Sequence, residues 1–527
     1  MKSVKIIGII VGILLFLMVG LVIILPYIFN IDRYRPFITK VLSNEIGREV
    51  EIKKISLSLL RGISISAKEV KINDPRRIDF PIMTVPKVRA DIALLSIFSK
   101  TVEIKRIVIT APEINIIEYF DGKLNIDGIG GINITDTEEM PAVVPVALLT
   151  PVTLIDPMMA TPEETVRSIA DHLKIRDVTV ETIKINNGRL FFYKENADFK
   201  ADALLISNGI NLSADEIFVS NIADVLSLEN TDPLLISLWN KVKYIESKLK
   251  VDILNGELMK SPFNDVHLDL TTKGGHVGLT EASVSIFGGK ITNKGFFDLR
   301  GEKKFGKITI EASDIEANEF LNAISDETDL IVGTLKLTGS YDFPIGTIKE
   351  ITKGFTGGGK IDIVNGYITD FSLRDELAST FGVSPEILPE SLDTGDFDYM
   401  GGEYYIMSER AYTDNFTINS SIYDAMAQGS LGLDKTLDVN GEILLKEEIT
   451  SSEFFKKAVS FMGITETLYT IPFSISRTLD DVQFTIHYNQ YFLAAMDIFL
   501  EAIGAKEKGE KRRTLKEFGG DLYNKFR

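Results

Sequence analysis

The side chains that most often carry enzymatic chemistry are few in this chain, and their spacing forms no known catalytic motif. Its four histidines, His172, His267, His276 and His487, lack the H-E-x-x-H spacing of a zinc site. No G-x-S-x-G sequence is present, so the chain has no nucleophile elbow. Cysteine is absent, which excludes thiol catalysis, disulfides and thiolate-bound metals.

One glycine-rich segment approaches a nucleotide-binding motif. Residues 354–360, Gly-Phe-Thr-Gly-Gly-Gly-Lys, satisfy G-x-x-x-x-G-K, but Ile361 stands where a P-loop has the Ser or Thr that holds Mg²⁺. The residues that follow alternate like a strand, whereas a P-loop leads into a helix whose N-terminus binds phosphate. We interpret the segment as a turn, and we expect a protein that is not an enzyme and holds no cofactor or metal.

The strongest signal is an apolar run from Ile6 to Ile28, interrupted only by glycines and Pro26. At ~1.5 Å per residue it spans a hydrocarbon core of roughly 30 Å. A cleaved signal peptide would have a shorter apolar core and small residues at its cleavage site, and no such pattern is present. We therefore predict a transmembrane anchor that contains Ile6, Ile10, Leu14, Leu17, Leu21, Ile24 and Ile28. Lys2 and Lys5 favour a cytoplasmic N-terminus, with the bulk of the chain across the membrane.

Length and charge limit the remaining possibilities. A chain of 527 residues exceeds what one core normally supports, so several domains or one elongated body are expected. A net charge of −18 argues against nucleic acid as the main ligand. Only the tail after Gly504 is clearly basic. Such a tail can contact anionic lipid headgroups or a partner, and it is equally typical of a solvated helix face.

After the anchor, the apolar period indicates a helix and then a β-meander. Asp32 is expected to cap a helix that ends at Gly47, with Tyr34, Phe37, Ile38, Val41 and Leu42 on one face. From Arg48 the apolar residues alternate with polar ones, and Asn73-Asp74 and Asp121-Gly122 read as turns. We predict antiparallel strands with one apolar face, in which the pattern slips by one residue before Val70.

The rest of the chain is predicted to be mainly strands with a few helices. Residues 129–175 form a Pro-rich apolar insertion with a helix capped by Thr161. Asn187-Gly188 reads as a hairpin turn, and a helix is expected from Pro233 to about Leu249, with Trp239 in a core. From Leu249 to Tyr488 short strands alternate with glycine-rich turns. Three further helical segments are expected at Asp370–Phe381, Ser452–Met462 and Tyr491–Ile503.

Apolar strand surface is in excess, because 45% of the residues are hydrophobic and few helices are long enough to cover the strands. Two sheets that bury each other would account for this surface. An apolar face that stays open as a groove for lipid would account for it equally well.

Several blocks of residues, in order along most of the chain, resemble the AsmA-like proteins of Gram-negative bacteria. The start of that family resembles Asn30–Pro36, Gly47–Val50, Ser56–Leu59 and Ala67–Val70, and its next block resembles Ile104–Asn115 and Asp121–Asn125. Its carboxy-terminal domain resembles Asn187–Leu190, Ser285–Lys290, Gly333–Gly339 and Ile471–Ser476.

The resemblance implies a mainly β fold with short helices: an N-terminal transmembrane helix, then an elongated, curved antiparallel sheet that forms an open, taco-like groove. The expected divisions are 1–30 (anchor), 31–128 (N-terminal groove region), 129–175 (insertion), 176–489 (C-terminal β-rich region) and 490–527 (amphipathic helix and basic tail). Candidate groove residues are Val50, Ile52, Leu57, Ile63, Ile65, Ile107, Ile109, Ile114 and Ile116. Strand parity alone does not identify the face that lines the groove, because each slip inverts the pattern.

We expect an inner-membrane, periplasmic protein that serves outer-membrane lipid homeostasis by binding or transferring phospholipid or another acyl lipid. A scaffold that assists outer-membrane or periplasmic proteins through its sheet edges is the second hypothesis. A cell-envelope enzyme whose site does not show in the sequence is the third. No nucleic-acid partner is expected.

Overall fold

A computed structural model describes residues 31–58, 63–77, 80–93, 101–129, 177–196, 201–219, 244–301, 303–324, 330–463 and 466–506. The predicted anchor Ile6–Ile28, nearly all of the insertion 129–175, Trp239 and the basic tail beyond Lys506 lie outside these residues. Within them, no helix has both the length and the apolar character needed to cross a membrane.

The chain divides into two compact units. Unit 1 comprises Met1–Ile286, Ile291–Ile308 and Phe343–Ile351. Unit 2 comprises Phe287–Lys290, Thr309–Asp342 and Thr352–Arg527. Both are built mainly from strands, which confirms the predicted fold class at that level.

The described part of unit 1 begins with a helical segment packed on its first strand. The short helix η1 (Ile31–Tyr34) leads into α2 (Arg35–Ile46), which ends at Gly47 with φ 70°, as predicted. Ile38 and Val41 are buried, which confirms the predicted apolar face. The predicted cap is wrong, because Tyr34 holds the N-cap position. The Asp32 carboxylate instead accepts a hydrogen bond of 2.8 Å from Ile55 N–H of the adjacent strand.

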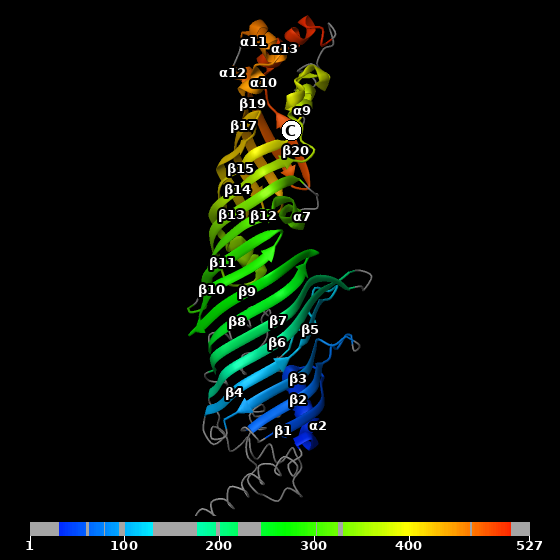
Figure 1. The fold of residues 1–527 in the computed structure, drawn as a ribbon, viewed down its shortest axis with the longest axis vertical. Coiled ribbons are helices and arrows are strands. Elements are labelled where there is room, and N and C mark those ends of the chain that lie inside the picture. The colour runs from blue at the N-terminus through cyan, green and yellow to red at the C-terminus, as the bar shows by residue number, and fades with distance from the viewer. Residues whose placement is uncertain are drawn as a thin grey trace, which may run out of the picture. The chain divides into compact units, whose positions relative to one another are not determined.

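Ten strands follow in unit 1, and they lie side by side in one sheet (Figure 1). They are β1 (Val50–Ser58), β2 (Ile63–Ile72), β3 (Met83–Ile92), β4 (Thr101–Thr110), β5 (Glu113–Glu118), β6 (Asp177–Glu195), β7 (Ala201–Val219), β8 (Ile245–Leu258), β9 (Ser261–Lys273) and β10 (His276–Ile286). Strands β1 to β4 pair antiparallel in chain order, and so do β6 to β10. Only β6 departs from the predicted antiparallel arrangement, because it runs parallel to both β4 and β5.

Two predictions for this unit are wrong. Asn187-Gly188 is not a hairpin turn: it lies inside β6, where Asn187 has φ 55° and the pairing with β7 shifts by a β-bulge. The helix expected up to Leu249 is also wrong in its last residues, because β8 begins at Ile245. Pairing with both β7 and β9 outweighs the helical spacing there.

The strands β11 (Gly289–Asp298) and β12 (Phe305–Glu316) contribute residues to both units. Most of β13 and all later strands belong to unit 2, and from β13 onward each strand pairs antiparallel with the next. They are β13 (Ile331–Pro344), β14 (Thr356–Ile368), β15 (Asp396–Met407), β16 (Arg410–Asn419), β17 (Tyr423–Gly432), β18 (Thr436–Leu445), β19 (Thr470–Thr478) and β20 (Asp481–Ile486).

Short helices close one end of the unit 2 sheet (Figure 1). The described helices of this part are α7 (Ala317–Ile324), α8 (Ile348–Gly354), α9 (Leu373–Phe381), η3 (Pro385–Ile387), η4 (Glu390–Leu392), α10 (Glu447–Thr450), α11 (Glu453–Met462), α12 (Glu466–Tyr469) and α13 (Gln490–Ala502). The three helical segments predicted here are confirmed as α9, α11 and α13. Leu377, Phe455 and Met496, one from each, are at most 1% exposed and share one core with β17–β19.

The glycine-rich segment 354–360 is not the predicted turn. Helix α8 ends at Gly354, and β14 already runs through Gly357–Gly359. At Gly359 a Cβ atom would lie 1.9 Å from the carbonyl oxygen of Thr338, so only glycine fits between these strands. The strand that was expected after this segment is present, and it excludes the helix that a P-loop needs.

We expect Leu377→Ala to destabilise unit 2 by about 2–5 kcal/mol, because it leaves a cavity in the core beneath the helices. Thermal unfolding followed by near-UV circular dichroism measures the effect. Ile498→Ala on α13, where the side chain is 60% exposed, is the control and should change stability by less than about 0.5 kcal/mol. Equal effects of the two substitutions would contradict this account of the core.

Candidate functional site

One face of the unit 1 sheet carries an unbroken apolar row across nine strands, from β1 to β10 with β5 omitted. Each member is the cross-strand partner of the next: Leu57, Ile65, Ala90, Ile107, Ile183, Ala214, Leu249, Leu270 and Leu279. Because partners in a sheet lie side by side at about 4.8 Å, the row is a continuous apolar strip perpendicular to the strands.

A second apolar row runs beside the first on the same face. Its members are Ile55, Ala67, Val88, Ile109, Ile185, Leu212, Val251, Leu268 and Ala282. The row between the two points to the opposite face and contains Ser56, Ser66, Arg89, Val108, Lys184, Ser213, Lys250, Asp269 and Glu281. The sheet therefore has one apolar face, which we call the apolar face, and one polar face, which we call the outer face.

Residues with left-handed backbone keep the apolar side chains on one face along each strand. Glu69 on β2 has φ 49°, and the pattern slips there, so that Ala67 and Val70 both stay on the apolar face. Ala111, between β4 and β5, has φ 48° and lies opposite the bulge at Asn187. Each of these irregularities inserts one residue into its strand, so the apolar side chains beyond it return to the apolar face.

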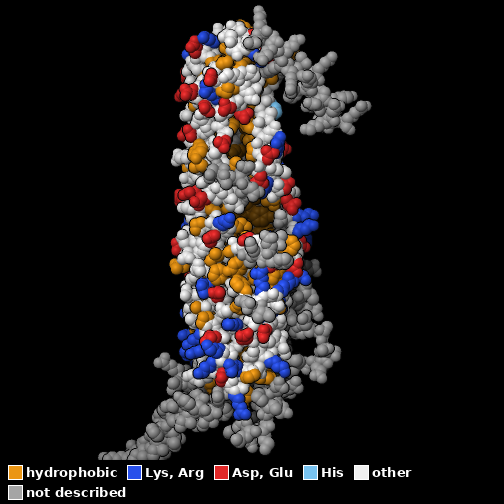
Figure 2. Space-filling model, turned by 90° about the vertical axis from the view of Figure 1, so that its right-hand side faces the viewer, with side chains coloured by type: hydrophobic (Ala, Val, Ile, Leu, Met, Phe, Trp, Pro, Cys, Tyr) orange, Lys and Arg blue, Asp and Glu red, His pale blue; other side chains and the backbone are white. Residues whose placement is uncertain are grey.

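The apolar face is only partly covered. Most side chains of the two rows are half-buried, whereas Ile55 and Leu279 are 5% and 9% exposed. The described residues between Gly47 and Ile286 contain no helix that could pack on this face. Figure 2 shows hydrophobic side chains in recesses between charged ones on the side of the molecule that it draws. The described part of unit 1 thus leaves apolar surface within reach of a ligand.

The nine candidate groove residues all lie on the apolar face, but in two different surroundings. Leu57, Ile63, Ile65, Ile107, Ile109, Ile114 and Ile116 are half-buried there, with Ile114 and Ile116 beside Leu190 and Phe192 of β6. Val50 and Ile52 are 2% and 8% exposed because they form a closed core with Ile38 of α2. These two residues therefore anchor the helix and do not reach open surface.

Sequence reasoning missed the part of the apolar face that β7 to β10 provide. Leu212, Val251, Leu268 and Leu270 continue both rows. The alternation Leu249, Val251, Ile253 was the available signal, and strands were predicted from Leu249 onward, but none of their residues was assigned to the groove.

Side chains of the helical segment occupy the free edge of β1. Val50 N–H donates to Ser43 Oγ at 2.9 Å, and Ile55 N–H donates to Asp32 Oδ1. The Arg35 guanidinium donates to the carbonyl oxygens of Ile52 and Lys53. Backbone groups that would otherwise attract another strand are thereby satisfied.

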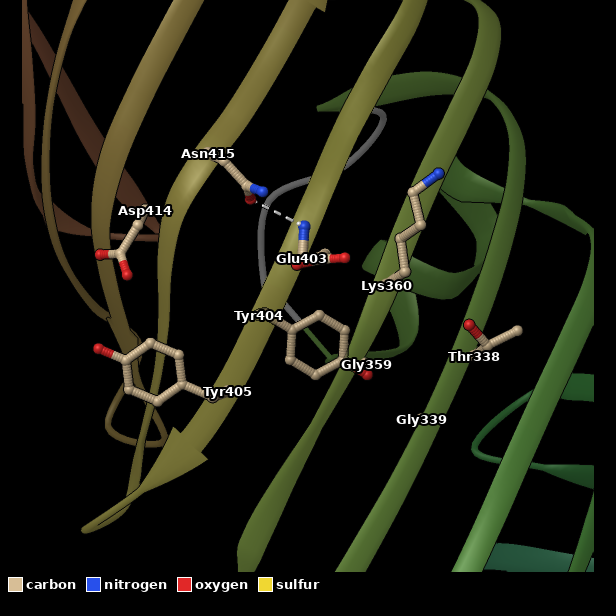
Figure 3. A pocket seen from close by; sticks show the side chains of 9 residues that line it. All are labelled: Thr338, Gly339, Gly359, Lys360, Glu403, Tyr404, Tyr405, Asp414 and Asn415. Carbon is tan, nitrogen blue, oxygen red and sulfur yellow. Dashed lines mark hydrogen bonds between the residues drawn. The ribbon is translucent and has the colours of Figure 1, made fainter.

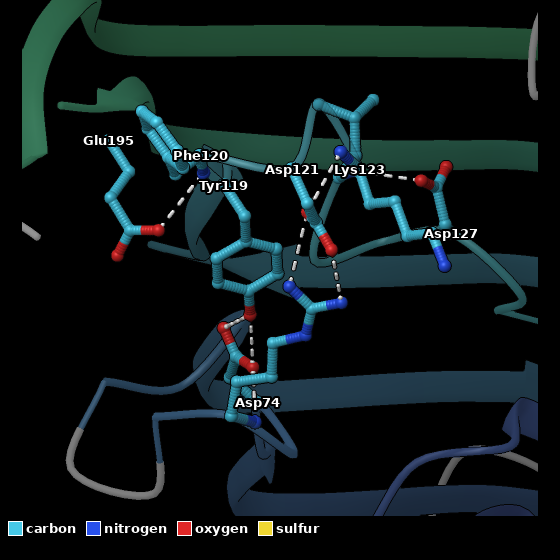
Figure 4. A network of polar contacts seen from close by, with 9 residues as sticks. Asp74, Tyr119, Phe120, Asp121, Lys123, Asp127 and Glu195 are labelled. Carbon is cyan, nitrogen blue, oxygen red and sulfur yellow. Dashed lines mark hydrogen bonds and ion pairs between the residues drawn. The ribbon is translucent and has the colours of Figure 1, made fainter. Parts of the chain in front are cut away.

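A polar network, buried at Asp74, Tyr119 and Glu195, ties the ends of β2, β5 and β6 together (Figure 4). The Tyr119 hydroxyl lies 2.5 and 2.6 Å from the carboxylate oxygens of Asp74, which is completely buried. Arg76 donates to both oxygens of Asp121 at 3.2 and 3.0 Å, and its guanidinium lies 4.2 Å from the centre of the Tyr119 ring. The Glu195 carboxylate accepts from Phe120 N–H at 3.0 Å and pairs with Arg77.

The network shifts the acidity of its members in the directions that their contacts require. Burial and the hydrogen bond to Asp74 raise the pKa of Tyr119. The hydrogen bond from Arg76 lowers the pKa of Asp121, and that from Phe120 N–H, with the Arg77 charge, lowers the pKa of Glu195. All these groups are paired with one another, so the network stabilises the sheet margin and leaves no free acid or base.

A separate hollow of about 540 Å³ lies in unit 2, where the pairing of β15 with β16 is irregular (Figure 3). Asn415 Oδ1 accepts from Glu403 N–H at 3.1 Å, in place of a ladder hydrogen bond. Lys360, the lysine of the glycine-rich segment, lies 2.9 Å from Asp362. Because Glu403 and Asp414 also line the hollow, it is unsuited to phosphate.

The model of the AsmA family matches residues 1–213, so this part of the chain is AsmA-like, as the resemblance indicated for it. The match covers the helical segment and the strands from β1 into β7, which hold most of the apolar face. This family is generally associated with the cell envelope, which indicates an envelope-related function. No curated protein and no solved structure matches the chain.

We expect Tyr119→Phe to loosen the sheet margin by about 1.5–3 kcal/mol, because it removes a hydrogen bond to a buried carboxylate. Hydrogen exchange of peptides that cover 113–127 should become faster. Tyr405→Phe, at a ring that is 44% exposed, is the control and should leave exchange in that segment unchanged. Unchanged exchange in Tyr119→Phe would contradict the stabilising role of the network.

We also expect Glu195 to make stability depend on pH. Its folded pKa lies below the unfolded value of about 4.3, so its contribution is complete above that pH and is lost as pH falls through the folded pKa. Glu195→Gln should therefore flatten the loss of stability below about pH 4.3, measured by urea unfolding at pH 3 to 7. Exposed Glu386→Gln is the control, and an identical acid profile of wild type and Glu195→Gln would refute the assignment.

Proposed function

We propose that this AsmA-like protein binds acyl lipid on the apolar face of unit 1 and moves it within the cell envelope. The observation that carries the proposal is the pair of apolar rows across nine strands, half-buried and without a covering helix among the described residues. An acyl chain on such a surface gains about 0.8 kcal/mol per buried CH₂ group.

The uniformity of the rows supports movement as well as binding. Hydrophobic contact is non-directional, so a chain that shifts from Ile107 toward Ile183 exchanges one apolar contact for an equivalent one. No polar side chain interrupts either row from β1 to β10. A lipid would therefore meet no step at which a specific bond must break.

Unit 2 provides an internal comparison. Its corresponding row consists of Leu335, Ile363, Met400, Ile418, Ala425, Ile443 and Ile471. Most of these side chains are at most 4% exposed, and those near the C-terminal helices belong to a closed core. The partial exposure in unit 1 is thus not a necessary feature of such strands, which favours a binding role for it.

The envelope setting follows from the family, and the finer placement is proposed: an inner-membrane anchor at Ile6–Ile28, a periplasmic body and a role in outer-membrane lipid homeostasis. We propose further that the protein is not an enzyme. The scaffold alternative would use open sheet edges, and the occupied edge of β1 supports it less well.

Site-specific photo-crosslinking in cells tests the proposal. Benzoylphenylalanine in place of Ile107 should give phospholipid adducts detectable by mass spectrometry, because Ile107 lies on the apolar face. The same group in place of exposed Glu281 should give none, because Glu281 is the partner of Asp269 on the outer face. Adducts to proteins at both positions, without lipid, would favour the scaffold.

A substitution on the apolar face provides a second test of the proposal. Ile107→Asp should reduce lipid adducts at Leu249, in the same row, at least about tenfold, because an unpaired carboxylate against an acyl chain costs more than 1.4 kcal/mol. Val108→Asp is the matched control and should leave them unchanged. If both variants retain wild-type adduct levels at Leu249, the apolar face is not the lipid path.

A further inference from the structure

Three lysines stand in direct register on the outer face of the first strands. Lys54 on β1 is the partner of Lys68 on β2, which is the partner of Lys87 on β3. All three are exposed. Like charges directly opposite each other destabilise a sheet, so this row lowers stability unless an external anion offsets it.

The row belongs to a larger cluster of cations. With exposed Arg89, Arg106 and Lys184 on neighbouring strands it forms what we call the basic patch. Asp91 lies among these residues and pairs with Arg89 at 2.8 Å. No described carboxylate forms an ion pair with the three lysines, whereas Lys53 nearby pairs with Glu69 at 2.7 Å.

Hydroxyl groups adjoin the lysine row on the same face. Ser56 is the partner of Ser66, with their Oγ atoms 2.9 Å apart, and Ser58 is the partner of Ser64. Hydroxyls and ammonium groups together are the donors that phosphate oxygens accept. The patch is thus a surface of phosphate-binding groups repeated at the strand spacing.

We propose that the basic patch docks on the phosphate headgroups of an anionic phospholipid surface. Charge complementarity supports this occupant: residues 31–129 hold 17 Lys and Arg against 13 Asp and Glu, whereas residues 130–504 hold 30 against 58. The acidic residues 130–504 repel a long polyanion such as nucleic acid.

The position of the patch along the chain points the same way. It begins 26 residues after Ile28, the end of the predicted anchor, and side chains of η1 and α2 hold β1 directly. The patch lies on the face opposite the apolar rows. The inference therefore goes beyond acyl-lipid binding and stands or falls independently of it.

A single fluorophore tests the docking, because the chain has no cysteine of its own and one introduced cysteine is therefore labelled alone. The full chain with Ser58→Cys, labelled with the environment-sensitive dye NBD, is placed in nanodiscs of phosphatidylcholine alone or with 30% phosphatidylglycerol. We expect at least a twofold rise and a blue shift of emission in the anionic discs only, reversed by 0.5 M NaCl through screening.

The triple variant Lys54→Gln, Lys68→Gln, Lys87→Gln should lower this signal to the phosphatidylcholine level without lowering the unfolding temperature, because it removes repulsion. The matched control Lys248→Gln, Lys250→Gln, Lys273→Gln has the same change in charge on other strands of unit 1 and should keep the signal. The proposal is overturned by equal emission in both discs, by equal loss of signal in both triple variants, or by a lower unfolding temperature of the patch variant. It is also overturned if single-stranded DNA, added as a competitor, reduces the signal more than added anionic vesicles do.

Discussion

The alternation of side chains along a β-strand is the constraint on which this structure depends. A strand offers every second residue to each face, so one misplaced residue would carry a polar side chain into the apolar rows. The chain meets this constraint with bulges. Glu69, Ala111 and Asn187 adopt left-handed backbone conformations where the pattern slips, and Ile114 and Leu190, which lie beyond Ala111 and Asn187, therefore still share the apolar face with Ile107 and Ile183. The conformational cost of such residues is small beside the burial that correct phase provides over nine strands.

In both units the strands keep their apolar side chains on one face, but the units differ in what covers these side chains. In unit 2, α9, α11 and α13 pack on the ends of β17–β19, and Ile443 and Ile471 become part of a closed core. In unit 1, α2 covers only Val50, Ile52 and their immediate neighbours, and the described strands beyond it stay half-exposed. Helical cover thus distinguishes a stabilising core from a surface available to a ligand, although both arise from the same alternation.

Polar groups support the sheet mainly at its margins. Ser43 and Asp32 satisfy N–H groups along the edge of β1, where a backbone ladder would otherwise remain open. At the ends of β2, β5 and β6, buried Asp74 is retained because Tyr119 and the adjoining backbone supply its hydrogen bonds. The turn signals at Asn73-Asp74 and Asp121-Gly122 thereby have a second use, since their carboxylates also hold neighbouring strands together.

The sequence by itself determined the mainly β class, the helix that ends at Gly47, the helices α9, α11 and α13, and the apolar character of residues such as Leu57 and Ile107. These features follow from local periodicity and from glycine and serine at helix ends, which depend on nearby residues only. Tertiary structure alone decided that residues 245–249 form a strand, that Asn187-Gly188 is a bulge, and that Val50 lies beneath α2 while Ile107 does not. An apolar segment takes its conformation from the strands on either side, and an Asn-Gly pair with positive φ fits a turn and a bulge equally well. The face that each residue occupies depends on the register of every preceding strand, and only the assembled sheet defines that register.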